Sequence, residues 1–284
     1  MFPRCRMPSF ILLLLSLLGL GGCDTSAYHR SGGQWRHGDV AFTPEDPATF
    51  QALDSRFARD AKRGYFLGAA VAGSDGASFA VVSENEARDK QAVYYCDTYR
   101  KGQEYWSILH LRMERIEGAD AASYAAIGKG HARDARRVYF RGRAFDVKDV
   151  ASFEPLDGDF GRDAQSAYYA RIAIAGSHGP SFEIIDDRDM AYARDRERAY
   201  ATHDAGNGER EAPQVRRLRT QDPAAMRVLG RGYAADVRQV WYRGQVVRGA
   251  DAGSFASDTS YASSVDATDR SGNWQQGRRA ASSP

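Results

Sequence analysis

The chain has 284 residues, and its 39 Lys and Arg residues nearly balance 37 Asp and Glu residues, for a formal net charge of +2. The arginines are interspersed with aspartates and form no basic block. Neither the charge nor its distribution therefore supports nucleic acid as a partner.

The first 22 residues predict a secretory signal peptide. Arg4 and Arg6 precede an apolar run of about a dozen residues, which is shorter than the roughly 20 apolar residues of a membrane-spanning helix. The run ends in Leu20-Gly21-Gly22-Cys23, which resembles the lipobox of bacterial lipoproteins. This resemblance implies cleavage before Cys23 and a lipid anchor on its thiol, in a cell-envelope membrane and facing the periplasm or the exterior. The alternative is an ordinary signal peptide with an incidental Cys23.

Cleavage before Cys23 has two consequences for the mature chain. It would remove two basic residues and leave 37 charges of each sign, so the mature net charge would be zero. It would also remove Cys5, and lipidation would occupy Cys23. Cys96 would then be the one remaining thiol, which excludes an intramolecular disulfide even in an oxidising compartment. Because Cys96 follows an aromatic pair, we expect a strand residue rather than a nucleophile.

A flexible tether is predicted over residues 23–34, which are polar and include Gly32-Gly33. Residues 35–256 then repeat one pattern. A copy begins with an aspartate and carries an aromatic residue five positions later, followed by a second aromatic residue in every copy but that of Asp195, which has Ala201. In its clearest versions it closes with a second aspartate, then Ser-Phe three and four residues further on. Six aspartates begin such a copy: Asp60, Asp89, Asp134, Asp163, Asp195 and Asp236.

The spacing of these aspartates indicates a 29-residue unit. Asp60 and Asp89 lie 29 residues apart, as do Asp134 and Asp163. Two copies contain insertions, of 16 residues near 97–113 and of 12 residues near 202–214. The segment Asp46-Pro-Ala-Thr-Phe50 adds a half unit in front of the first full copy. We therefore predict a half repeat followed by six units.

Each part of the unit has a predicted structure. Runs such as Val-Tyr-Tyr are β-branched and aromatic, which favours half-buried strands. The first aspartate can accept hydrogen bonds from the backbone of its own turn. The second aspartate stands at the N-cap of a short helical turn, with Pro47 and Pro223 at the first helical position. The unit thus predicts two or three short strands and one capped turn.

The predicted fold is mainly β, a solenoid-like array of about six β-hairpin repeats, each with a short capped helical turn. The alternative is an irregular propeller-like closure. We disfavour closure because a propeller blade takes four strands and about 40–50 residues, which a 29-residue unit does not supply.

The repeat resembles the DKNYY family of bacterial exported proteins and lipoproteins. The best matches are Asp134-Ala-Arg-Arg-Val-Tyr-Phe and Asp236-Val-Arg-Gln-Val-Trp-Tyr, within residues 35–256. The family's asparagine is absent here, and Asp89-Lys90 alone keeps the lysine. The resemblance implies this repeat type and an envelope location, but it supplies no catalytic residue.

The first insertion is the strongest candidate for a binding site. It combines aromatic residues with arginines, as protein interfaces do at their energetic centres, and the predicted partner-binding residues are Tyr99, Arg100, Tyr105, Trp106 and Arg112. We expect a non-enzymatic envelope lipoprotein that binds a protein partner, and an immunity-type protein that neutralises a toxin is one specific version. The alternative is a module that binds cell wall or polysaccharide, or an envelope enzyme.

Other candidate sites are weaker. The repeated aspartates could be paired catalytic carboxylates, but their recurrence in every unit favours turns and caps. Two acidic segments carry oxygen ligands that suit calcium, although neither has the twelve-residue loop pattern: Asp157, Asp159 and Asp163, and Asp204, Asn207 and Glu209. The histidines lack the spacing of zinc ligands. We therefore predict no catalytic residue, metal or cofactor, and a low-complexity, disordered tail over 257–284.

Overall fold

The computed structural model describes residues 27–106, 108–186, 192–203, 214–258 and 265–280. The predicted signal peptide and the predicted lipidation site Cys23 lie outside these residues. The described chain is mainly β, as predicted, with repeated small antiparallel sheets and no closed barrel. Its helices are 3-10 helices of three residues each, η1 (Gly76–Ser78), η2 (Gly102–Glu104), η3 (Gly179–Ser181) and η4 (Pro223–Ala225).

The sheets follow one another along the chain, and each contains consecutive strands. The first has three strands, β1 (Tyr28–Ser31), β2 (Gln34–His37) and β3 (Val40–Phe42). Three four-stranded sheets follow: β4 (Gln51–Ala52), β5 (Phe57–Arg59), β6 (Gly64–Phe66) and β7 (Ala69–Ala70); β8 (Ala80–Ser83), β9 (Glu86–Arg88), β10 (Val93–Tyr99) and β11 (His110–Arg115); β12 (Ala125–Gly128), β13 (His131–Arg133), β14 (Val138–Phe140) and β15 (Arg143–Phe145).

Four further sheets of four strands complete the described chain: β16 (Glu154–Pro155), β17 (Phe160–Arg162), β18 (Ala167–Tyr169) and β19 (Ile172–Ala173); β20 (Glu183–Asp186), β21 (Tyr192–Arg194), β22 (Ala199–His203) and β23 (Gln214–Leu218); β24 (Arg227–Gly230), β25 (Tyr233–Ala235), β26 (Val240–Tyr242) and β27 (Gln245–Val246); β28 (Ala256–Ser257), β29 (Ala267–Asp269), β30 (Gly272–Gln275) and β31 (Arg278–Arg279). Many strands have only two to four residues, and for this reason a short unit accommodates four of them.

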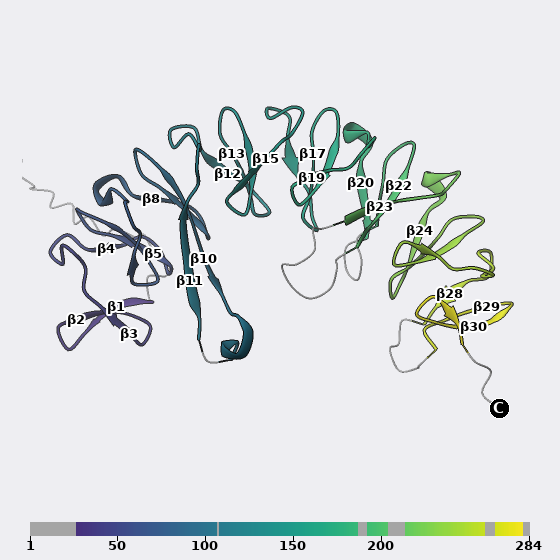
Figure 1. Ribbon diagram of the computed structural model, residues 1–284, viewed down its shortest axis with the longest axis horizontal. Coiled ribbons are helices and arrows are strands. Elements are labelled where there is room, and N and C mark those ends of the chain that lie inside the picture. Colours follow the sequence, from purple (N-terminus) through teal and green to yellow (C-terminus); the bar gives the residue numbers. More distant parts are fainter. Residues whose placement is uncertain (1–26, 107, 187–191, 204–213, 259–264, 281–284) are drawn as a thin grey trace, which may run out of the picture.

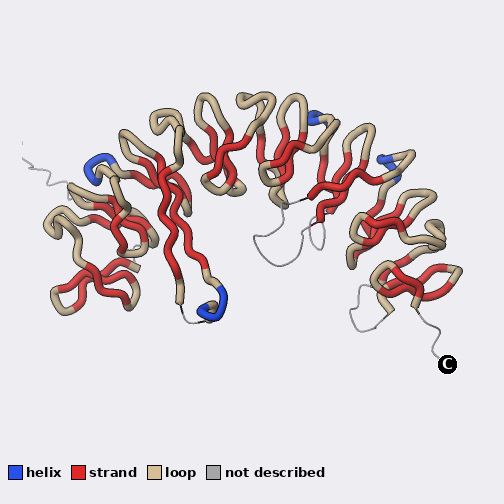
Figure 2. Tube along the Cα trace, viewed as in Figure 1, coloured by secondary structure: helices blue, strands red, loops and turns tan. Residues whose placement is uncertain are grey.

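The sheets are arranged along an open arch, with β1–β3 at one foot and β28–β31 at the other (Figure 1). Figure 2 places η1, η3 and η4 on the outer side of the arch and η2 at the end of a long hairpin on the inner side. The arch does not close on itself, so the propeller-like alternative is not observed. The expectation that a 29-residue unit is too short for four strands was nevertheless wrong, because each described sheet after the first has four strands.

The expected disordered tail over 257–284 is wrong for residues 265–280. Asp269 begins another copy of the pattern, with Trp274 five residues later, and β28–β31 form a sheet. Trp274 and Ala267 are buried in a cluster with Phe255. A long polar connection conceals this copy in the sequence, because few of its residues are apolar.

The predicted tether is also too long. β1 pairs with β2, and the buried ring of Tyr28 packs on Phe42 and Phe50. The Tyr28 hydroxyl donates a hydrogen bond to the Arg56 carbonyl at 2.7 Å. Residues 28–34 therefore belong to the first sheet.

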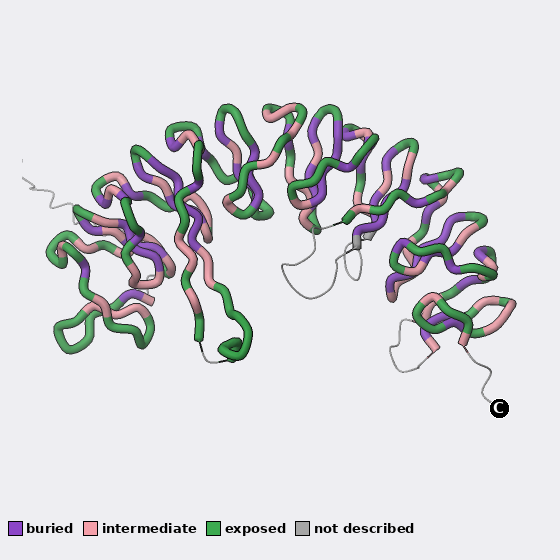
Figure 3. Tube along the Cα trace, in the orientation of Figure 1, coloured by how far each residue is buried: buried purple, intermediate pink, exposed green. Residues whose placement is uncertain are grey.

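The core lies between successive sheets rather than in one centre. Phe79, in the connection between β7 and β8, packs 6.3 Å from Phe57 and 6.1 Å from Tyr94, measured between ring centroids. Equivalent clusters recur along the chain, and Figure 3 shows buried segments throughout the arch with exposed loops at its margins. Each sheet is therefore stabilised by its neighbours, as expected for a repeat protein.

Each repeated aspartate joins a hairpin turn to the connection from the preceding sheet. In Asp89, Oδ1 accepts the backbone N–H groups of Gln91 and Ala92 at 2.7 and 2.8 Å, which closes the β9–β10 turn. Oδ2 accepts the Asp75 N–H at 2.7 Å and the Tyr94 hydroxyl at 2.9 Å. Asp75 in turn caps η1 through the Ser78 N–H. The same four kinds of contact occur at Asp60, Asp134, Asp163 and Asp195.

These hydrogen bonds keep the buried aspartates ionised. Burial by itself would raise the pKa of Asp89, but the N–H groups of Asp75 and Gln91 and the Tyr94 hydroxyl outweigh it and lower the pKa. The pKa is lowered in the same way at Asp60, Asp134, Asp163 and Asp195. The structure thus confirms the predicted turn and cap roles, with 3-10 helices at Asp75 and Asp222 and shorter hydrogen-bonded turns at Asp46 and Asp120.

We predict that Asp89→Asn destabilises the protein by about 1–3 kcal/mol, because an amide nitrogen would face the Asp75 N–H and Tyr94 hydroxyl donors. Asp157→Asn is the matched control, since Asp157 is exposed and forms a surface ion pair with Lys129, and should cost less than about 1 kcal/mol. Urea unfolding measures both. Equal losses in the two variants would contradict the role of Asp89.

The lowered pKa values also predict an acid limit. A carboxyl group with a lowered folded-state pKa contributes stability above its unfolded pKa of about 3.9 and loses it as pH falls through the folded pKa. The melting temperature should therefore hold from pH 7 to about pH 5 and fall steeply below about pH 4. Calorimetry across this range tests it, and a melting temperature that rises on acidification would show that these carboxylates do not stabilise the fold.

Candidate functional site

One hairpin has longer strands than the rest of the array. β10 has seven residues and β11 has six, and six residue pairs join them from Tyr94–Arg115 to Tyr99–His110. Only Val93, Tyr94 and Tyr95 of β10 also pair with β9. The rest of the hairpin extends beyond its sheet and projects into the inner side of the arch (Figure 1). This projection is the predicted first insertion.

The end of the hairpin is held by specific contacts. η2 forms the turn, and the Arg100 guanidinium donates a hydrogen bond to the Tyr105 carbonyl at 2.9 Å. His110 Nε2 lies 3.1 Å from a carboxylate oxygen of Glu104. The Tyr99 ring stacks on His110 with a centroid distance of 5.1 Å and an interplanar angle of 23°. Side chains at this end are therefore positioned by their neighbours.

The hairpin end exposes a concentrated group of apolar side chains. Of the 11 large hydrophobic residues that are exposed in the described chain, six lie here, and we call them the tip cluster: Tyr99, Tyr105, Trp106, Ile108, Leu109 and Leu111. Trp106 is 89% exposed, and its ring makes an edge-to-face contact with the Tyr105 ring at a centroid distance of 5.1 Å. Exposed apolar groups gathered in one place are typical of an interaction site.

The structure brings together four of the five predicted partner-binding residues. Tyr99, Arg100, Tyr105 and Trp106 all lie at the hairpin end and are exposed. Arg112 lies in the stem instead, where it forms an ion pair with Asp97 at 2.8 Å and stacks over the Tyr95 ring at 5.5 Å. Its position fits support of the hairpin base.

Sequence reasoning missed the aliphatic half of the tip cluster. Ile108, Leu109 and Leu111 stand inside the insertion, in the run Ser-Ile-Leu-His-Leu. The predicted binding residues were chosen among aromatic and arginine residues, so these three aliphatic residues were left out. Their exposure could have been predicted from the sequence. An inserted segment lies outside the repeat, so its aliphatic residues have no position in the core between sheets.

The other candidates take structural roles. Asp157 and Asp159 each form an ion pair across the sheet boundary, with Lys129 and Arg141, and Asp163 closes its hairpin. Within the described residues no three His, Cys, Asp or Glu side chains are grouped as a metal site. The second calcium candidate, residues 204–209, lies outside the described residues. Cys96 is fully buried, which raises the pKa of its thiol to about 12.

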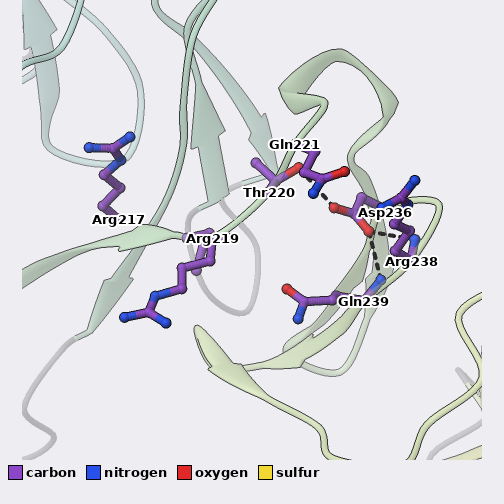
Figure 4. A pocket seen from close by; sticks show the side chains of 8 residues that line it. Arg217, Arg219, Thr220, Gln221, Asp236, Arg238 and Gln239 are labelled. Carbon is purple, nitrogen blue, oxygen red and sulfur yellow. Dashed lines mark hydrogen bonds between the residues drawn. The ribbon is translucent and has the colours of Figure 1, made fainter.

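A polar groove of about 820 Å³ surrounds Asp236. Trp241 replaces the usual tyrosine of this copy, and the Thr220 hydroxyl donates to Asp236 Oδ2 at 2.8 Å in its place. Figure 4 shows the guanidinium groups of Arg217 and Arg219 directed away from Asp236 and apart from each other. The groove therefore offers no convergent set of charges for one ligand.

Comparison with protein families, curated proteins and solved structures found no match to this chain. The resemblance to the DKNYY family stays a prediction. Among the described residues, no helix has the length and apolar character to span a membrane.

Proposed function

We propose that this protein is a lipid-anchored protein of the bacterial cell envelope that binds a protein partner through the tip cluster and catalyses no reaction. The exposure of the tip cluster is the observation that carries this proposal. Its aromatic and aliphatic side chains form an apolar centre, and Arg100 and Lys101 add charge beside it. An apolar centre with a polar margin is the usual composition of a protein interface.

The geometry of the hairpin also suits recognition. Its strands pair from Tyr94–Arg115 to Tyr99–His110, and the contacts of Arg100, Glu104 and His110 fix the turn. A binding segment that is already ordered loses less conformational entropy when its partner arrives. The projecting position on the inner side of the arch leaves the tip cluster accessible (Figure 3).

We propose further that the arch is a solenoid-like array of the 29-residue unit, with the copy at Asp269 added to the six predicted ones. A lipid on Cys23 would place the first sheet at the membrane, because the five residues to Tyr28 span at most about 18 Å. The immunity-type role stays a prediction.

We predict that the double variant Tyr105→Ser, Trp106→Ser loses the partner. Affinity capture from envelope extract identifies a protein retained by the wild type, and calorimetry with that purified protein should then show at least about 30-fold weaker binding, because central aromatic residues each contribute about 2 kcal/mol or more. The melting temperature should not change, since both side chains are exposed.

Val237→Ser is the matched control, because Val237 is an exposed apolar residue elsewhere in the array, 68% exposed. It should bind the partner as the wild type does. Undiminished binding by the double variant would refute the proposal. Retention on purified peptidoglycan that depends on Tyr105 and Trp106 would instead favour the polysaccharide-binding alternative.

A further inference from the structure

One core position of the repeat changes from an aromatic to a polar residue in three copies, two of which are consecutive. The residue three positions before the repeated aspartate is aromatic in four copies, Phe57, Phe160, Tyr192 and Tyr233. It is Glu86 in the copy of Asp89, His131 in the copy of Asp134 and Asp266 in the copy of Asp269. All three are buried, with 5%, 1% and 4% of their surface exposed. A repeat offers a special place for ligand binding only where its pattern is broken, and the copies of Asp89 and Asp134 are neighbours that both break it.

Glu86 belongs to a paired replacement. In other copies this position packs on the residue four after the N-cap of the following connection, as Phe57 does on Phe79 after Asp75 and Phe160 on Phe182 after His178, at 6.3 and 5.6 Å between ring centroids. In the copy of Asp89 that second residue is Tyr124, and its hydroxyl donates to Glu86 Oε1 at 2.7 Å. A polar pair has thus replaced an aromatic pair.

A pocket of about 270 Å³ lies beside this pair, between the sheets β8–β11 and β12–β15. Ser83, Asn85, Glu86 and Tyr95 line it from the first sheet and its turns, and Lys129 and Arg141 line it from the second. It also adjoins the base of the long hairpin, because Arg112 of β11 stacks over Tyr95. Its volume suits a group the size of a side chain.

The carboxylate of Glu86 is the unpaired charge of this pocket. It accepts hydrogen bonds from the hydroxyls of Tyr124 and Ser83, at 2.7 and 2.9 Å, and none of the described basic residues forms an ion pair with it. Burial raises the pKa of Glu86, and the two hydroxyls only partly offset this effect. Glu86 accepts these two hydrogen bonds from the described residues, whereas a repeated aspartate such as Asp89 accepts four. Its charge is therefore less well compensated, and a cation in the pocket would stabilise it.

The nearby positive charges are already neutralised. Lys129 pairs with Asp157, and Arg141 pairs with Asp159 at 3.1 Å. His131 also lines the pocket, but burial lowers the pKa of its imidazole to about 4, so the ring is neutral at pH 7. The Tyr95 hydroxyl makes no hydrogen bond to another described residue and is available to a ligand. The pocket therefore offers acceptors and one uncompensated negative charge.

We propose that this pocket binds a ligand that ends in an alkylammonium or guanidinium group, with the Glu86 carboxylate as its counter-ion and the Tyr95 hydroxyl as a second acceptor. The group could belong to a free small amine or to a Lys or Arg side chain of the protein that binds the tip cluster. Both sources present the same chemistry to Glu86.

Calorimetry on the detergent-solubilised full chain tests the proposal with n-butylguanidinium, n-butylammonium and n-butanol as probes. The two cations should bind and the alcohol should not. Glu86→Gln should weaken cation binding at least tenfold, since the amide still accepts the Tyr124 hydrogen bond but carries no charge. Glu45→Gln is the matched control and should bind as the wild type does, because Glu45 is exposed, does not line the pocket and is already paired with Arg63. Absence of cation binding, or equal binding by Glu86→Gln, would overturn the assignment.

A second variant distinguishes a role of Glu86 in cation binding from a purely structural role. The double change Glu86→Phe, Tyr124→Phe restores the aromatic pair seen at Phe57 and Phe79, so it should raise the melting temperature and abolish cation binding. A lower melting temperature than the wild type, or retained cation binding, would overturn the assignment. Weaker affinity of Glu86→Gln for the captured partner would identify a partner side chain as the source of the cation, and unchanged affinity would identify a free amine.

Discussion

The fold depends on one interaction, the buried carboxylate that closes its own hairpin turn with one oxygen and holds the preceding connection with the other. Strands of two to four residues have too few ladder hydrogen bonds to define a sheet firmly. At Asp89, four donors converge on a single side chain and set the β9–β10 turn relative to η1. Repeated along the chain, this contact positions one sheet on the next and leaves the aromatic residues to fill the space between them.

Function is expected where this uniform scheme is interrupted, and the copy of Asp89 is interrupted twice. The insertion lengthens β10 and β11 into a projecting hairpin with exposed apolar residues. At the base of the same hairpin, Glu86 and Tyr124 replace an aromatic pair and a pocket adjoins them. Tyr95 connects the two features, since it lines the pocket and carries Arg112 of the hairpin stem on its ring.

The sequence was sufficient to predict the local roles and insufficient to predict their assembly. The turn role of Asp60 and the capping role of Asp75 follow from residue type and spacing, and the structure confirms both. The four-stranded sheets escaped prediction, because edge strands such as β7 have two residues and no pattern of their own. The last copy was missed since its core is reduced to residues such as Ala267 and Trp274. The insertion was recognised from the repeat spacing, but the position of Arg112 in the hairpin stem could not be predicted, because only the structure shows Asp97 opposite it.

The most direct test of the central claim removes the hairpin and keeps its sheet. Residues 96–113 would be replaced by the two-residue turn Arg-Gly. The next sheet shows that this turn fits, because Arg141-Gly142 connects the paired residues Phe140 and Arg143, and Tyr95 and Glu114 are paired in the same way. Binding of the captured partner is then measured by calorimetry, with circular dichroism as the check on folding. We expect a folded array that no longer binds the partner. A folded array that binds it with wild-type affinity would contradict the claim that this hairpin is the binding site.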